Sequence, residues 1–79
     1  MKILMVEPGK APKEKNISGT LDSMQEAVGG TIQAIYPFDE PVALICNDDG
    51  KLMNLPMCRS IHEIGDIIFG SFFVCAAPP

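Results

Sequence analysis

Residues 41–50, PVALICNDDG, decide the class of fold. PVALIC (41–46) is apolar on both faces of an extended chain, which is typical of a strand in the middle of a sheet. NDDG (47–50) is a hairpin signal, because Asp-Gly tolerates the positive φ angles that match the twist of paired strands. We therefore expect a strand at 41–46, a hairpin turn at 47–50 and a partner strand at 51–55, closed by Pro56.

Three further stretches are typical of strands. MKILMV (1–6) is a short apolar run that stops at Pro8 and Gly9. TIQAIYPF (31–38) alternates, with Ile32, Ala34 and Tyr36 on one face. The segment 66–77 is long and apolar, and we expect Gly70 to form a bulge within a single strand. Residues 57–65 fit either one helical turn or an irregular loop.

The remaining segments are a polar loop and a short helix. Residues 8–19 are rich in lysine and proline and have no periodicity, so they predict a loop of about twelve residues. In 20–28 the apolar residues recur at helical spacing. Thr20 or Asp22 can cap this helix, Asp22 has the capping-box spacing to Gln25, and Gly29-Gly30 ends it.

Together these segments predict a single small domain over residues 1–79. Its class is α+β, with a mainly antiparallel sheet of about five strands in the order β-α-β-β-β-β and one short helix on one face. One helix covers one face, yet the strands at 41–46 and 66–77 are apolar on both faces. Either loops or a second copy must cover the other face, and we expect a homo-oligomer.

Composition excludes several classes of protein. The chain has 79 residues and a net charge of −4, which opposes general binding to DNA or to anionic membranes. No apolar run approaches the roughly 18 residues of a membrane helix. Three cysteines, Cys46, Cys58 and Cys75, make an odd number. They are interpreted as reduced, buried thiols of a cytoplasmic protein.

No motif predicts catalysis, a metal or a cofactor. Cys58 and His62 have i, i+4 spacing, but two ligands make half of a structural zinc site. The same pair lacks the third group that would orient a catalytic dyad. Asp48-Asp49 is explained by the turn at Gly50, and no phosphate-binding glycine motif is present. We therefore expect a protein that is not an enzyme and holds no metal or cofactor.

The candidate binding residues are cations, amides and one aromatic ring. Lysines of the 8–19 loop can surround a phosphate, unless the loop is merely a solvated connection. Arg59 is suited to an anion, although it can also pair with Glu63 or Asp66. Tyr36 can stack on a base or sugar. The predicted ligand-binding set is Lys10, Lys13, Tyr36, Asn47, Lys51, Asn54 and Arg59.

Four segments carry a resemblance that covers most of the chain: EPGK (7–10), VGGTIQAIYPF (28–38), VALICNDDGKLMNLP (42–56) and IIFGSFF (67–73). They resemble an uncharacterised small-domain family encoded by bacteriophages and mobile elements of gut bacteria. The family continues past its proline with an asparagine–arginine pair, of which Cys58-Arg59 keeps the arginine. Segment 60–66 is shorter than in the family. The chain ends at 77–79 where the family continues into an acidic tail, so we expect a trimmed chain.

The resemblance implies an accessory protein in the cytoplasm of a bacterial host and assigns no activity to any residue. We expect a non-catalytic counter-defence protein that sequesters a nucleotide-derived immune signal in pockets between subunits. The alternatives are a protein–protein inhibitor of a host defence nuclease and a structural or regulatory accessory protein. The expected partners are a second copy of the chain and either an anionic nucleotide-like molecule or a host defence protein.

Overall fold

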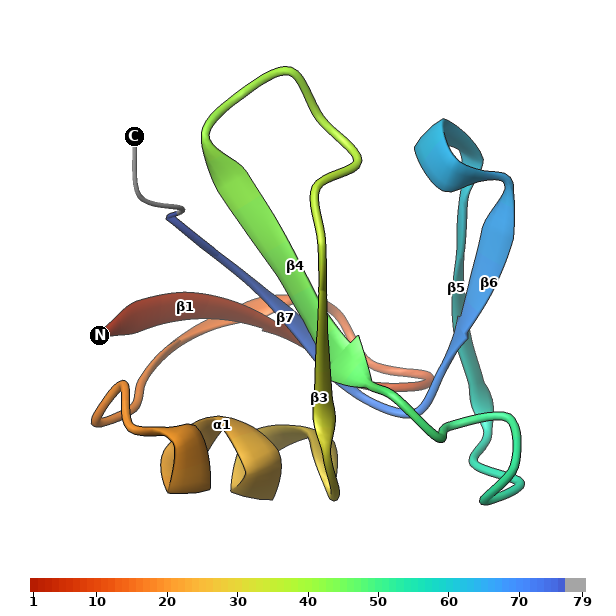
Figure 1. Cartoon of the computed structure of the whole chain (residues 1–79), viewed down its shortest axis with the longest axis horizontal. Helices are drawn as coiled ribbons and strands as arrows, with labels where there is room; N and C mark the ends of the chain where they lie inside the picture. The colour runs from red at the N-terminus through yellow and green to blue at the C-terminus, as the bar shows by residue number, and fades with distance from the viewer. Residues whose placement is uncertain (77–79) are drawn as a thin grey trace.

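The computed structural model describes residues 1–76 and confirms a small α+β fold. Its main sheet has five antiparallel strands in the order β2-β1-β7-β4-β3, and a second sheet pairs β5 with β6 (Figure 1). The strands are β1 (Lys2–Val6), β2 (Lys13–Asn16), β3 (Ile32–Ile35), β4 (Val42–Asn47), β5 (Met57–Ile61), β6 (Asp66–Phe69) and β7 (Phe72–Ala76). The helices are α1 (Leu21–Val28) and a 3-10 turn, His62–Ile64.

The helix forms where the sequence predicts it. Thr20 is its N-cap, and the Thr20 hydroxyl accepts a hydrogen bond from the Ser23 N–H at 3.2 Å. Asp22 therefore lies inside the first turn and is not the cap. Gly29 ends the helix in the left-handed conformation, with φ of 79°. Val28 is buried and packs with Phe73 on one face of the five-stranded sheet.

The other face of the sheet is covered by the chain itself. Strands β4 and β7 alternate, so that Leu44 and Phe72 lie on the face opposite α1. Cys58 of β5 and Ile68 of β6 pack against them in a second buried cluster. The sequence left open whether loops or a second copy cover this face; the chain itself covers it, because residues 57–69 fold into a two-stranded sheet over this face (Figure 1).

A homo-oligomer stays a prediction, but it no longer follows from an uncovered face of the sheet. Its remaining basis is the set of large apolar side chains exposed in the single chain, among them Leu52, Met57 and Tyr36. Light scattering coupled to size-exclusion chromatography is expected to give a multiple of the 8.5 kDa chain mass. A particle of 8.5 kDa at micromolar concentration would contradict it.

Three local predictions were wrong. Residues 13–16 form β2, paired with β1, where a loop was expected. All four side chains of β2 are exposed, and an edge strand of this kind shows no apolar alternation. Residues 51–54 form successive turns and no hairpin strand; the partners of β4 are β3 and β7. Residues 57–61, expected as a helical turn or loop, form β5, and the helical turn is confined to 62–64.

The expected long C-terminal strand is two strands in different sheets. Gly70 has φ of 84°, which turns the chain out of β6, and its N–H donates to the Pro56 carbonyl at 2.7 Å. The chain then enters β7 at the centre of the main sheet. Residues 77–79, which include the end of the expected strand and the expected point of trimming, lie outside the described residues.

Candidate functional site

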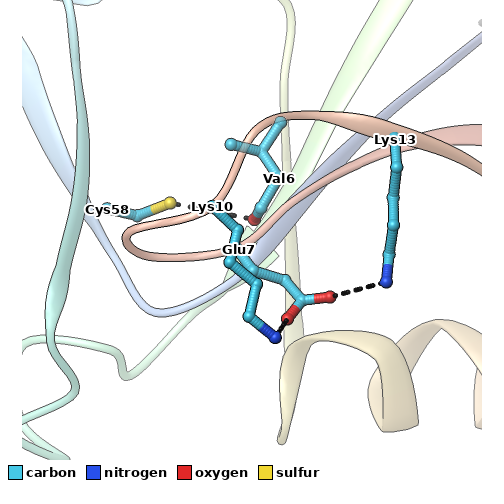
Figure 2. Close-up of polar contacts among 5 residues, drawn as sticks. All are labelled: Val6, Glu7, Lys10, Lys13 and Cys58. Atoms are coloured by element: carbon cyan, nitrogen blue, oxygen red, sulfur yellow. Dashed lines mark hydrogen bonds and ion pairs between the residues drawn. The ribbon is translucent and has the colours of Figure 1, made fainter.

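The turn between β1 and β2 gathers positive charge around one carboxylate. The Glu7 carboxylate forms one ion pair with the Lys10 ammonium group at 3.2 Å and a second with the Lys13 ammonium group at 3.5 Å (Figure 2). The side-chain hydrogen bond from Lys10 is the largest of the effects that lower the pKa of Glu7, and the charge of Lys13 adds to it. The carboxylate therefore stays ionised and holds two of the predicted lysines at one end of the sheet.

Strand β5 holds this turn from the other side. The Cys58 thiol donates a hydrogen bond to the Val6 carbonyl at 3.7 Å (Figure 2). The Arg59 guanidinium donates to the Lys10 carbonyl at 3.4 Å, across 49 positions of sequence. Lys10, Lys13 and Arg59, three of the seven predicted ligand residues, are therefore brought together. We name this group the cationic turn.

A groove of ≈ 450 Å³ opens beside the cationic turn, between β1, β2 and α1. In β2, Lys13 lies opposite Met5 and Lys15 opposite Ile3, and opposed residues share a face of the sheet. Met5 and Ile3 pack toward the helix, so both lysines lie on the groove side. The groove is lined by Met5, Glu7, Lys15, Ile17, Ser18, Ser23, Glu26, Ala27 and Ser71.

Within residues 1–76, Lys15 and Arg59 make no ion pair with a carboxylate. The sequence predicted Lys15 to lie in the 8–19 loop and left it out of the ligand set, as it left out Ser71 at the groove wall. The signal for Lys15 was its i, i+2 spacing from Lys13, which puts both ammonium groups on one face of a strand. No local pattern marks Ser71, because its position depends on the pairing of β7 with β1.

Asn47 and Lys51 lie at a different hollow, of ≈ 380 Å³. Asn47 is buried; its amide nitrogen donates to the Val28 carbonyl at 3.1 Å, and its amide oxygen accepts from the Asp49 N–H at 2.8 Å. These bonds tie β4 to the end of the helix, which is a structural role. Lys51 pairs with Asp66 at 3.1 Å and lies 5.8 Å from the centre of the Phe69 ring.

This second hollow is acidic. Besides Lys51 and Asp66 its walls carry Asp48 and Asp49. The pKa of Asp66 is lowered first by the hydrogen bond from the Ile67 N–H and then by Lys51, so this carboxylate is ionised at neutral pH. Three carboxylates therefore face one ammonium group, and the hollow is poorly suited to an anion.

Tyr36 and Asn54 join neither group. Tyr36 is 64% exposed and follows β3, which is at the edge of the sheet opposite β2. Asn54 has φ of 58° in the turns after β4, a conformation that asparagine tolerates and that accounts for its position. Within one chain the seven predicted residues are therefore spread over separate places.

The thiols lie where they are hard to ionise. Burial raises the pKa of Cys46, Cys58 and Cys75. Cys58 is in a strand and His62 in the following 3-10 turn, so their sequence spacing is not that of two residues on one helix face. Across the described part of the chain, no three His, Cys, Asp or Glu side chains gather around a potential metal position. None of the helices described is both long enough and apolar enough to cross a bilayer.

Comparison with known proteins identifies the family. Residues 1–79 match the family described as a domain of unknown function (DUF3846). This agrees with the resemblance to an uncharacterised small-domain family, and the chain belongs to DUF3846. No curated protein and no solved structure matches the chain.

Proposed function

We propose that this member of the DUF3846 family is a non-catalytic protein that captures a small anionic, nucleotide-like molecule at the cationic turn and in the adjoining groove. The observation that carries the proposal is the contact between Arg59 and the Lys10 backbone, which brings a guanidinium from β5 to the lysines of the β1–β2 turn. Charged groups recruited from distant parts of a sequence to one end of a sheet form a natural anion site.

Four cationic side chains at the turn and groove (Lys10, Lys13, Lys15 and Arg59) outnumber the two carboxylates there (Glu7 and Glu26), which favours a phosphate-bearing ligand. Arg59 can offer paired N–H donors, and Lys15 supplies an ammonium group inside the groove. Lys10 and Lys13 are shared with the Glu7 carboxylate, so they are held in place and add positive charge at the rim. A groove of ≈ 450 Å³ is within the range of small-ligand sites. The hydroxyl of Ser71 adds a polar group at its wall.

The cellular role rests on the resemblance alone. A protein of phage or mobile-element type, acting in the bacterial cytoplasm, would remove a nucleotide-derived immune signal by binding it intact. Capture without turnover accords with thiols whose pKa is raised by burial, because a protonated thiol is a weak nucleophile.

A thermal-shift series tests anion capture. Cyclic dinucleotides and ADP-ribose are expected to raise the Tm, because a ligand that binds the folded state stabilises it by about 2.7 kcal/mol at 100 times its Kd. Arg59→Ala and Lys15→Ala should each weaken binding about tenfold, the loss of one charge-assisted contact. Each variant is compared with its own ligand-free Tm, and mass spectrometry should recover the ligand unchanged.

Lys2→Ala is the matched control. Lys2 is also an exposed lysine of the β1–β2 pair, but it alternates away from the helix face and pairs with Glu14 at 3.6 Å. Its removal should leave ligand affinity nearly unchanged at physiological salt. Equal losses from Lys2→Ala and Lys15→Ala would contradict a defined site, and a flat response to every nucleotide would end the proposal.

A second candidate is a protein–protein inhibitor or accessory protein. The observation that favours it is the acidic surroundings of β3, where Asp39, Glu40, Asp48 and Asp49 are all exposed. Such a surface suits a basic protein partner more than a nucleotide. If this second function holds, the protein is expected to co-purify with its target protein whether or not nucleotide is added.

A further inference from the structure

The two edges of the main sheet differ in chemistry. The edge strand β2 reads KEKN, and its exposed charges discourage another strand from pairing. The other edge strand, β3, reads IQAI and carries no charge, lysine or proline. Within residues 1–76 no strand pairs with the outer side of β3. One edge is therefore protected and the other is open.

The backbone of β3 presents hydrogen-bonding groups at this open edge. The Asp48 N–H donates to the Thr31 carbonyl at 2.9 Å, in register with the pairing of Gln33 opposite Cys46. In an antiparallel pair the residues alternate between facing the partner and facing away. The N–H and C=O groups of Gln33 and Ile35 therefore point to β4, and those of Ile32 and Ala34 point outward.

The acidic hollow lies directly beside this edge. Gln33 and Ile35 of β3 form one wall, and Ile67 and Phe69 of β6 lie among the other lining residues of the ≈ 380 Å³ space. An added strand alternates its side chains between the two faces of a sheet. Every second side chain of a strand laid along β3 would therefore enter this hollow, whose lining includes the apolar residues Ile35, Ile67 and Phe69 beside its carboxylates.

Charge decides what kind of strand fits. Asp48 and Asp49 are exposed near the start of β3, and Asp39 and Glu40 are exposed after its end. Lys51, the lysine at the hollow, is already paired with Asp66. In a two-fold antiparallel pair of β3 strands, the start of one strand meets the end of the other. A second copy would therefore set carboxylates against carboxylates, whereas a basic strand meets opposite charge.

We propose that the outer edge of β3 binds an extended basic segment of another protein, which adds to the main sheet as a sixth strand. The backbone groups of Ile32 and Ala34 supply the hydrogen bonds, the hollow takes alternate apolar side chains, and the four carboxylates select lysine or arginine between them. This site is on the opposite edge of the sheet from β2 and does not depend on anion capture at the cationic turn.

A capped peptide of alternating lysine and valine is the probe. Titration followed by backbone amide NMR should show saturable binding, with the Ile32 and Ala34 amides gaining protection from hydrogen exchange. The same peptide with glutamate for lysine should bind at least tenfold more weakly. N-methylation of the peptide amides that face β3 should abolish pairing while leaving its charge unchanged. Equal binding of the lysine and glutamate peptides, or indifference to N-methylation, would overturn the proposal.

Ala34→Pro tests the edge from the protein side. Proline removes the outward N–H of residue 34 and spares the bonds of Gln33 and Ile35 to β4, as proline does on natural edge strands. Peptide affinity should fall at least tenfold, while Ala34→Thr, which keeps the N–H, should bind like the parent. If Ala34→Pro fails to fold, the N-methylated peptide still decides the question. A dimer of the free chain that Ala34→Pro converts to monomer would assign the edge to a second copy and overturn the proposal.

Discussion

Phe73→Ala is expected to remove most of the free energy of unfolding of this protein at 25 °C. Phe73 is fully buried in β7, the central strand, and packs with Ile3, Met5 and Val28 in the cluster under the helix. Truncation of a core phenylalanine costs about 3–5 kcal/mol, because it removes buried apolar surface and leaves a cavity. A domain as small as this has a total stability near the lower end of about 5–15 kcal/mol.

Urea denaturation followed by circular dichroism measures this loss. Phe38→Ala provides the matched control, because it makes the same truncation at a side chain that is 39% exposed in the β3–β4 connection. Its cost should remain below about 1 kcal/mol, as is usual for surface substitutions. Similar midpoints for the two variants would show that Phe73 is not at the centre of the core.

Gly50→Ala is expected to destabilise the fold strongly. A Cβ atom at Gly50 would lie 2.5 Å from the Phe69 carbonyl oxygen, a backbone atom that cannot rotate away. The turns after β4 and strand β6 would therefore have to separate. Overpacking of this kind costs about 1–3 kcal/mol and occasionally more, and we expect a value near the upper end.

The comparison with Gly9→Ala isolates this steric effect. Gly9 has φ of 73°, but a Cβ there meets no atom within 4 Å. Its substitution should therefore cost about 1–2 kcal/mol, the usual strain of a left-handed alanine. Unfolding midpoints of the two variants measure the difference directly. A Gly50→Ala protein as stable as Gly9→Ala would mean that the turns and β6 are not in close contact.

Local signals predicted the helix and the two-faced strands. Thr20, the spacing of Leu21, Met24 and Val28, and Gly29 define the helix through contacts a few residues apart. The apolar run at 41–46 correctly predicted a strand buried on both faces: Ala43 and Ile45 lie in the core cluster under the helix, and Leu44 and Cys46 lie in the cluster on the opposite face. These features depend on capping, period and composition, which are properties of a short window of sequence.

Pairing between distant segments was not predictable in the same way. The NDDG signal was chemically sound as a turn, but Asn47 uses its side chain to bind Val28 and Asp49, and the chain leaves the sheet instead of returning along it. Strand β2 has no apolar residue and exists because β1 offers an open edge. Gly70 was expected to form a bulge within one strand, and nothing near it in sequence shows that the chain turns there from one sheet to another.

The same difference between local signals and long-range pairing explains which of the predicted binding residues lie together. Lys10 and Lys13 were chosen from one lysine-rich segment, and their common contact with Glu7 is local. Arg59 was chosen as the sole arginine, and its meeting with Lys10 depends on how β5 lies against β1. Asn47 was chosen for its polarity, although the same polarity serves a buried structural bond. Residue chemistry suggested the participants, and the topology decided which of them meet.

The central place of β7 affects how this chain folds during its synthesis. Strands β1 and β2, and strands β3 and β4, can pair as two separate hairpins while the ribosome is still adding later residues. Residues 72–76 then join the hairpins, because β7 lies between β1 and β4. Two-stranded hairpins are at best marginally stable in water. The nascent chain is therefore expected to stay open until β7 emerges, and then to close in one cooperative step.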